Sequence, residues 1–422
     1  MNTSKTPRLG GMKPLVAALA SGAAVLCASA DLPDPIIRWN MGTAANGKIA
    51  EKSGNGRDLR SINVFNLDST HYTGSEFGDD KMNAEGLREY VHRILGKGAF
   101  THFFICPGAQ VTLCDTKTMS PSWWRTGEAG VPLNDHMRRN YMMFTNGVDT
   151  IQVEIDAIRA HGVSPWLSMR MNDNHNANEP KAWLHSKFWV EHPEYRKQGG
   201  FNYSIPAVQD YHFAFIEEML ARYDVDGFEC DWMRWPIPQD PAVLTAFMRR
   251  TRAAVDAAAK RRGHPILLGV RVSSRPAAAL AKGMDVAAWV LEKLVDWVVP
   301  ANFFSSVDFD IPLGEWQKIV ADAGSSALVI PCLDTGVVTQ DPVTKRRSPR
   351  RMLTLAEYCG WAGRMYERGA PGVYFFNLFT YFEAAYHVTD TTPWDFIVTH
   401  GLTPESIKGR PASIPANWWY EP

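Results

Sequence analysis

Short apolar runs alternate with helical patterns along most of the chain. From residue 60 onward, eight runs rich in β-branched and aromatic residues can be counted, and stretches with apolar residues at helical spacing lie between them. The predicted strands are residues 62–67, 100–106, 164–171, 227–232, 266–272, 297–302, 327–332 and 372–377. Alternating β and α units are typical of a parallel sheet, and eight of them predict a (β/α)8 TIM barrel of the α/β class.

Several predicted helices between these strands have recognisable ends. One apolar stripe stops at Gly162, where a residue without Cβ can adopt the left-handed conformation that ends a helix. Asp240 before Pro241 is a good N-cap and first-turn pair, and Thr354 with Glu357 has the spacing of a capping box. These signals place helices after the second, fourth and seventh strands and support the barrel.

Two segments are longer than a minimal barrel needs. Residues 107–148 follow the second predicted strand and residues 172–206 follow the third, and both are rich in Asn, Pro, Trp and charge. The C-terminal ends of the strands carry the active site in such barrels, so these segments predict long substrate-binding loops on that face. We expect one barrel with an N-terminal lead-in over residues 31–400 and a tail packed on it over residues 401–422.

The first thirty residues have the pattern of a secretory signal. Basic residues precede an apolar run from Leu15 to Leu26, and Ala28 and Ala30 provide the small-x-small cleavage pattern. The alternative is a membrane anchor, but the run is shorter than the ~20 apolar residues that a spanning helix needs. We therefore expect a signal peptide over residues 1–30, cleavage after Ala30, a secreted or periplasmic protein, and no membrane contact after cleavage.

Charge and cysteine content exclude several classes of function. The formal net charge is -1, so no basic field is available to hold a nucleic-acid backbone, and a neutral or locally charged substrate fits better.

Loss of Cys27 with the signal leaves an odd number of cysteines, so at least one thiol stays unpaired within the chain. Cys106 and Cys114 either form a disulfide or stay as buried thiols. No Cys or His spacing typical of zinc is present, and we expect neither a cofactor nor a metal ion.

The densest group of acids lies on the fourth predicted strand, in the segment Asp226–Pro236. Residues two apart on a strand share a face, so Glu229 and Asp231 point to the same side, which we assign to the barrel interior. Two carboxylates this close repel each other, and one pKa rises unless a cation intervenes. Arg234 and Arg271 are the candidates for that cation.

Cleavage of a glycosidic bond requires a proton donor together with a nucleophile or a water-activating base, and paired carboxyl groups supply both. Because Glu229 and Asp231 lie on one side, Asp231 needs a partner from another strand, and Asp334, Asp173 and Glu383 all follow strand ends. Asp334 is favoured because it follows the seventh strand, across the barrel from the fourth. We predict that Asp231, Glu229 and Asp334 are catalytic; the alternative for Asp231 is a buried acid neutralised by arginine.

Other polar and aromatic side chains near the strand ends are predicted to bind substrate. Arginine can bind a carboxylate or sulfate or hold the acids in place, amides bind sugar hydroxyls, and aromatic rings stack on sugar rings. The predicted binding residues are Arg170, Asn172, Asp173, His175, Trp232, Arg234, Trp235, Arg271, Asn302 and Asn377. Two of the following six tryptophans are expected to stack on sugar: Trp123, Trp124, Trp183, Trp189, Trp232 and Trp235.

The segment YDVDGFECDWMRWP, residues 223–236, resembles the fourth-strand motif of glycosyl-hydrolase-like (β/α)8 families. In those families a YDVDGI-type entry is followed by a strand with acids and an aromatic-x-Arg-aromatic-Pro exit. The segment is also similar to the DGxDxDWE strand of chitinase-like hydrolases, with Asp226, Glu229 and Asp231 at acid positions. Met233 stands where that family has its proton-donating glutamate, so the resemblance does not imply substrate-assisted chitinase chemistry.

These features favour a secreted glycoside hydrolase that cleaves an oligo- or polysaccharide by carboxylate chemistry, with the resemblance covering residues 60–390. An anionic sugar stays open as the partner, because Arg170, Arg234 and Arg271 either balance the acids or recognise negative charge. One alternative is a non-catalytic carbohydrate-binding barrel. Another is a metal-dependent hydrolase or lyase that uses Asp173, His175 and Asp231.

Overall fold

A computed structural model describes residues 61–67, 71–303, 306–382 and 388–420. All of these residues belong to one compact unit, Arg38–Pro422. The predicted signal peptide, residues 31–58 of the lead-in, and Glu383 lie outside the described residues.

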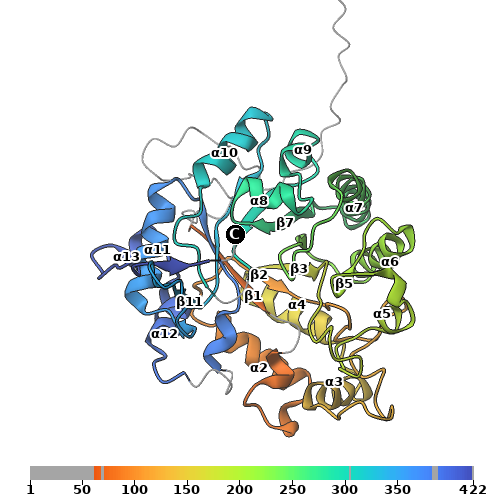
Figure 1. The fold of residues 1–422 in the computed structure, drawn as a ribbon. Coiled ribbons are helices and arrows are strands. Elements are labelled where there is room, and N and C mark those ends of the chain that lie inside the picture. Colours follow the sequence, from red (N-terminus) through yellow and green to blue (C-terminus); the bar gives the residue numbers. More distant parts are fainter. Residues whose placement is uncertain (1–60, 68–70, 304–305, 383–387, 421–422) are drawn as a thin grey trace, which may run out of the picture. The chain divides into compact units, whose positions relative to one another are not determined.

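A parallel sheet occupies the centre of the view in Figure 1, with α-helices around it. Its strand order is β10-β13-β1-β2-β3-β6-β7-β8-β9. The strands are β1 (Ile62–Leu67), β2 (His102–Ile105), β3 (Ser164–Arg170), β6 (Gly227–Asp231), β7 (Leu267–Ser273), β8 (Trp297–Ala301), β9 (Leu328–Val329), β10 (Cys332–Leu333) and β13 (Gly372–Phe375). Only Ile330 and Pro331 separate β9 from β10, which stand at opposite ends of this order, so the sheet curls round. The fold is of the α/β class and consistent with a TIM-barrel-like arrangement.

Seven of the eight predicted strands each coincide with one observed strand to within two residues at either end. The first is matched at both ends. The seventh is divided, because β9 pairs with β8 whereas β10 pairs with β13. Between them, the Ile330 N–H donates to the Val298 carbonyl at 2.9 Å, and the Pro331 carbonyl accepts from the Tyr374 N–H at 3.0 Å. The predicted strand is therefore one extended segment that bonds first to one neighbour and then to the other.

The helices are α1 (His71–Gly74), α2 (Ala84–Leu95), α3 (Asp135–Thr145), α4 (Thr150–Ala160), α5 (Lys187–Glu191), α6 (Pro206–Arg222), α7 (Pro241–Arg262), α8 (Pro276–Ala281), α9 (Val286–Leu291), α10 (Leu313–Asp322), α11 (Leu355–Glu367), α12 (Thr392–His400) and α13 (Pro404–Ile407). The predicted helix ends are confirmed. Asp240 caps α7, Thr354 and Glu357 form a complete capping box on α11, and Gly162, just beyond α4, has a φ of 69°. Within the described ranges, no helix combines the length and apolar character needed to cross a membrane.

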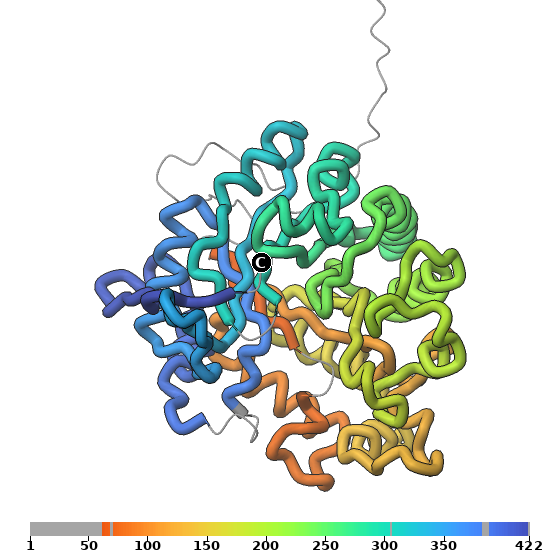
Figure 2. The backbone as a smooth tube through the Cα atoms, in the orientation of Figure 1, coloured from red at the N-terminus to blue at the C-terminus, as the bar shows by residue number. Residues whose placement is uncertain are grey.

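The two long insertions follow β2 and β3 and contact each other (Figure 2). The first contains α3, and the second contains α5 and a short hairpin of β4 (Arg196–Lys197) and β5 (Gly200–Phe201). A further antiparallel sheet joins β11 (Gly336–Thr339), which follows β10, to β12 (Arg351–Met352) and to β14 (Trp418–Trp419) near the C-terminus. The five cysteines of the described ranges are buried, and no disulfide joins Cys106 to Cys114.

Large aromatic side chains fill the space within the curled sheet. The Trp166 ring lies between Phe104 and Trp297, with ring centroids 4.7 and 4.5 Å away. Gly227 is required beside it, because a Cβ at that position would lie 2.2 Å from the Trp166 ring. Trp166 and Gly227 are register partners that precede the polar ends of β3 and β6 by four residues. The aromatic layer therefore supports the charged residues at the strand ends.

Candidate functional site

Three charged side chains meet in one row at the C-terminal ends of β3, β6 and β7. Arg170 is the register partner of Asp231, and Asp231 is the register partner of Arg271. All three are at most 5% exposed. One step deeper, Ser168 is the register partner of Glu229. Glu229 therefore lies beside Ser168, and Asp231 lies between Arg170 and Arg271.

Asp231 and Arg271 form a two-pronged ion pair. The Arg271 Nε donates to one Asp231 carboxylate oxygen at 3.0 Å, and Nη2 donates to the other at 2.8 Å. The Met233 backbone N–H adds a third hydrogen bond at 2.9 Å. Burial opposes the charge of Arg271, but Asp231 outweighs it and holds the Arg271 pKa above its ordinary range. Asp231 is thus fixed as a hydrogen-bond acceptor.

Glu229 lies beneath this pair in a different environment. Its Oε1 accepts hydrogen bonds from Ser168 Oγ at 2.6 Å and from the Tyr374 hydroxyl at 2.9 Å. The Tyr374 hydroxyl in turn accepts from Asn66 Nδ2 at 2.7 Å. Burial, and then the charge of Asp231, raise the pKa of Glu229 to about 7. Near neutral pH the lower carboxyl therefore carries a proton much of the time, while the upper one is paired with arginine.

A second charged cluster lies just beyond the end of β3. Asp173 Oδ1 is 2.6 Å from His175 Nδ1 and accepts the His175 backbone N–H at 2.9 Å. Asp173 Oδ2 is 3.4 Å from Arg170 Nη1, and His175 Nε2 is 3.3 Å from Arg234 Nη2. Burial opposes ionisation of Asp173, but the charges of His175, Arg170 and Arg234 outweigh it and hold the Asp173 pKa below its ordinary range.

The two clusters share one aromatic ring. The Arg271 guanidinium carbon lies 3.7 Å from the centroid of the Phe376 ring, and that of Arg234 lies 5.4 Å from it. Trp235, which has a φ of 49°, places its ring 3.8 Å from the His175 ring. Trp235 and His175 are partly exposed, whereas the acids behind them are buried. They form the accessible rim of the charged group.

Asp334 forms a third cluster at the end of β10. It accepts hydrogen bonds from the Thr335 N–H at 2.6 Å, Arg350 Nη2 at 3.0 Å and Asn377 Nδ2 at 2.8 Å. Asn377 has a φ of 60°, so its amide turns toward Asp334 directly after β13. Burial raises the pKa of the Cys332 thiol, and the charges of Arg271, Glu229 and Asp334 also act on it.

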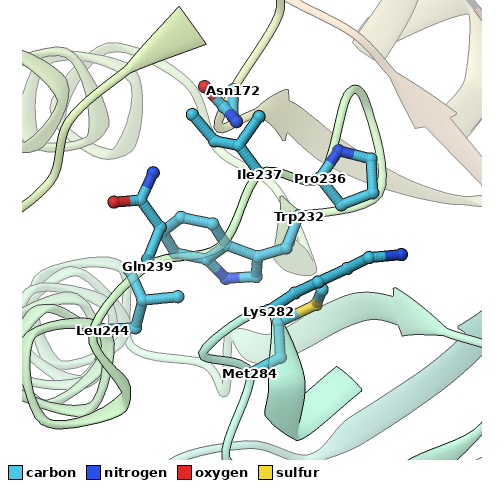
Figure 3. Close-up of a pocket in the computed structure, with 8 residues that line it drawn as sticks. All are labelled: Asn172, Trp232, Pro236, Ile237, Gln239, Leu244, Lys282 and Met284. Atoms are coloured by element: carbon cyan, nitrogen blue, oxygen red, sulfur yellow. The ribbon is translucent and has the colours of Figure 1, made fainter. Parts of the chain in front are cut away.

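Trp232 and Asn172, which were predicted to bind substrate, make packing and loop contacts in the structure. Trp232 is 3% exposed and packs beside Tyr203, because strand alternation turns it away from the face that Asp231 occupies. The Asn172 amide donates to the Trp235 carbonyl at 2.7 Å and accepts from the Phe201 N–H at 3.0 Å, so it fixes two loops. Both line the cavity of about 10 Å³ in Figure 3, which is the size of one water molecule. These contacts correct the prediction that the two residues face substrate at the strand ends.

The remaining tryptophans of the predicted set have partners in the insertions. Trp189 is buried on His185, Trp124 donates to the His185 carbonyl, Trp123 stacks on Phe144, and Trp183 stacks on His136. Asn302 donates to the Ser306 carbonyl four residues later. Of the six tryptophans, Trp235 is the one found beside the charged clusters in the described part of the chain.

Sequence reasoning missed several side chains of the site. Ser168 and Tyr374 lie on predicted strands at inward positions, so strand alternation would have found them. Phe376 follows β13 by one residue and shares that parity. Arg350 gave no signal, because it lies in the irregular segment between β11 and β12, sixteen residues from Asp334.

A metal centre has no ligand set in the ranges that the structure describes. No three His, Cys, Asp or Glu side chains come together there in a way that could hold a metal ion. Asp173 and His175 bond to each other, while Asp231 is paired with Arg271. The metal-dependent alternative has no geometric support from these residues.

No protein-family model matches the chain, and no curated protein matches it. Among solved structures, it is similar to an α-L-fucosidase isoenzyme 2 from Paenibacillus thiaminolyticus, with 13% identity, a TM-score of 0.47, and coverage of 82% of this chain and 49% of that one. It is also similar to a group IV chitinase from Ostrinia furnacalis, with 12% identity, a TM-score of 0.44, and coverage of 76% and 94%. An endo-β-1,4-mannanase from Thermotoga petrophila gives 12% identity, a TM-score of 0.42, and coverage of 76% and 69%.

The chain spans about half the length of the fucosidase. These fold neighbours are glycoside hydrolases by name. At 13% identity or less, this similarity concerns the fold alone.

Proposed function

We propose that the chain is an exported glycoside hydrolase that cleaves glycosidic bonds in an oligo- or polysaccharide at the C-terminal ends of its strands. The observation that carries this proposal is the position of Asp231, held by Arg271 at 3.0 and 2.8 Å at the end of β6. Glycosidic cleavage passes through an oxocarbenium-like state, and a fixed anionic carboxylate stabilises its positive charge or attacks it. Asp231 is the residue that we assign to this role.

Glu229 supports Asp231 from below. Its raised pKa of about 7 lets it take a proton and thereby reduces repulsion between the two acids. The Ser168 and Tyr374 hydroxyls fix its orientation. Asp334 remains the proposed second carboxylate, since it lies at the end of another strand and is 9% exposed.

Three further parts of the proposal each have an observation behind them. Closure of the eight βα units into a complete (β/α)8 barrel is supported by the continuity of β9 and β10 through Ile330 and Pro331. Export is supported by the sequence pattern of residues 1–30. An accessible rim of His175 and Trp235, backed by arginines, suits a sugar ring that carries negative charge.

One observation favours a second candidate, a barrel that binds carbohydrate without cleaving it. Asp231 is 1% exposed, and both of its oxygens already accept hydrogen bonds from Arg271. A carboxylate held this way could also fix the strand ends around a binding surface without taking part in cleavage.

A screen against plant, algal and microbial glycans separates the two candidates. The wild-type protein is incubated with each glycan, release of reducing ends is measured, and binding is measured in parallel by affinity electrophoresis. Release from at least one glycan, unaffected by a chelator, is the expected result. Binding without release would replace the hydrolase by the binding barrel, and release that stops with chelator would point to the metal-dependent class.

A further inference from the structure

The pair formed by Asp173 and His175 has the geometry of a proton-transfer device. Asp173 is 4% exposed and holds His175 Nδ1 at 2.6 Å, so the Nδ1 position is the one that carries the shared proton. The other ring nitrogen, Nε2, lies 3.3 Å from Arg234 Nη2; because a guanidinium can only donate, neutral His175 accepts there and gives up this contact when the ring is protonated. The His175 side chain is 30% exposed and lies at the accessible rim beside Trp235. A buried acid that orients a partly exposed imidazole is a recurrent arrangement for general acid and base catalysis.

The other acids at the strand ends are poorly placed to give a proton to a substrate. Met233, where chitinase-like hydrolases have their donor glutamate, is a buried thioether that carries no acidic proton. Glu229 is fully buried beneath Asp231. Asp334, the second carboxylate of the proposed function, accepts hydrogen bonds from Thr335, Arg350 and Asn377, so it suits stabilisation of positive charge on the sugar rather than donation of a proton.

We propose that His175 is the catalytic residue that transfers the proton, and that Asp173 is a positioning residue that acts through it. This inference rests on the proposed glycoside hydrolase function and names the donor that Asp231 needs. Arg271 and Arg234 lie over the same Phe376 ring, which places the donor group beside the pair made by Arg271 and Asp231.

The proposed step balances without a cofactor. The step starts from the imidazolium form of His175, which carries a proton on each ring nitrogen. Its Nε2 proton passes to the glycosidic oxygen as the bond between that oxygen and the anomeric carbon breaks, and the neutral ring keeps its Nδ1 proton. The positive charge that develops on the sugar faces the Asp231 carboxylate. Neutral His175 then takes a proton from the water that adds to the anomeric carbon, which restores the starting state.

Two variants test the role in turnover, with a matched control at another histidine. We expect His175→Gln to lower kcat/KM on a natural glycan by roughly 10² to 10⁴, and Asp173→Asn to lower it less. His264 pairs with Asp224 at 2.7 Å near the other end of β6, so His264→Gln should leave the rate unchanged. Dinitrophenyl glycosides of the same sugar need no proton on the leaving group, so His175→Gln should retain most of its activity on them.

The outcomes separate this inference from the proposed function. If Asp231→Asn is inactive while His175→Gln keeps full activity on the natural glycan, the role of His175 is wrong and the hydrolase stands. Equal losses of activity in His175→Gln on natural and dinitrophenyl glycosides would also overturn the role of His175 as proton donor, because they indicate a structural role. If the wild-type protein cleaves no glycan, the hydrolase and the donor role fall together.

A spectroscopic measurement tests the pair without any substrate. Long-range ¹⁵N–¹H spectra of the full chain, with the His175 signals assigned by their absence in His175→Gln, report which ring nitrogen carries the proton. Neutral His175 should carry it on Nδ1, and Asp173→Asn should weaken that preference. A proton on Nε2 in the wild-type protein, unaffected by Asp173→Asn, would overturn the inference.

Discussion

Replacement of Arg271 by methionine tests how strongly the site depends on its central ion pair. Methionine has a similar reach but no charge, so Asp231 would stay buried at the end of β6 without its two-pronged partner. Glu229, one step below, would then face an unbalanced acid, and one of the two carboxyls would have to take up a proton. We expect the variant to be markedly less stable than the wild-type protein.

The size of the effect follows from burial. Both partners are at most 2% exposed, and loss of one partner of a buried pair costs about 3–5 kcal/mol, because the remaining charge has no compensation. At roughly 2 °C per kcal/mol for a large domain, Tm should fall by about 6–10 °C. Arg170 is the register neighbour of Asp231 on the other side, so the lower end of this range is expected if it compensates in part.

A double-mutant cycle checks the reasoning by thermal unfolding followed by circular dichroism. Arg271→Met and Asp231→Asn should each destabilise the protein, whereas the double variant should recover most of the loss, since no buried charge is left unpaired. Additive losses in the double variant would refute the account of a coupled buried pair. A Tm change below 2 °C in Arg271→Met would refute it as well.

Two further variants test parts of the fold outside the charged site. Burial, and then the charge of Asp149, raise the pKa of Glu154 from 4.5 to about 8. Because the pKa in the folded state lies above that in the unfolded state, Glu154 stabilises the fold at low pH. That stabilisation is lost as the pH rises toward 8. Glu154→Gln should therefore flatten the decline of Tm between pH 5 and pH 9, and an unchanged slope would contradict the prediction. Gly227→Ala places a methyl group 2.2 Å from the Trp166 ring and should lower the free energy of unfolding in urea by about 1–3 kcal/mol. Gly314→Ala on α10 is the control, because a Cβ there would have nothing within 4 Å, and it should not destabilise the protein. Equal effects at the two glycines would contradict this prediction.

Local rules were sufficient to predict the strands and several helix ends. β-branched runs gave all eight strands, and the caps at Asp240 and Thr354 depend on contacts only two or three residues away. Alternation along β6 gave the shared direction of Glu229 and Asp231, because side chains on a strand repeat every two residues. The choice of Arg271 over Arg234 as the Asp231 partner needed the register between β6 and β7.

Contacts between distant segments account for what the sequence did not reveal. Glu229 and Tyr374 are 145 residues apart, and only the arrangement of strands brings their side chains to 2.9 Å. Trp235 adopts a left-handed backbone conformation just after β6, so strand alternation no longer predicts its direction. Arg350 reaches Asp334 from a segment without regular structure, and no periodic pattern marks such a residue.

The catalytic role of Asp231 is tested most directly by comparing two asparagine variants on a glycan that the wild-type protein cleaves. Asp226 begins the same strand segment but bonds to Ser164 and Arg159 at the opposite end of β6, which makes Asp226→Asn the matched control. With folding of each variant verified by circular dichroism, Asp231→Asn should lower turnover by roughly 10² to 10⁴, while Asp226→Asn keeps the wild-type rate. Near-full turnover by folded Asp231→Asn would contradict the assignment of the β6 strand end as the catalytic centre.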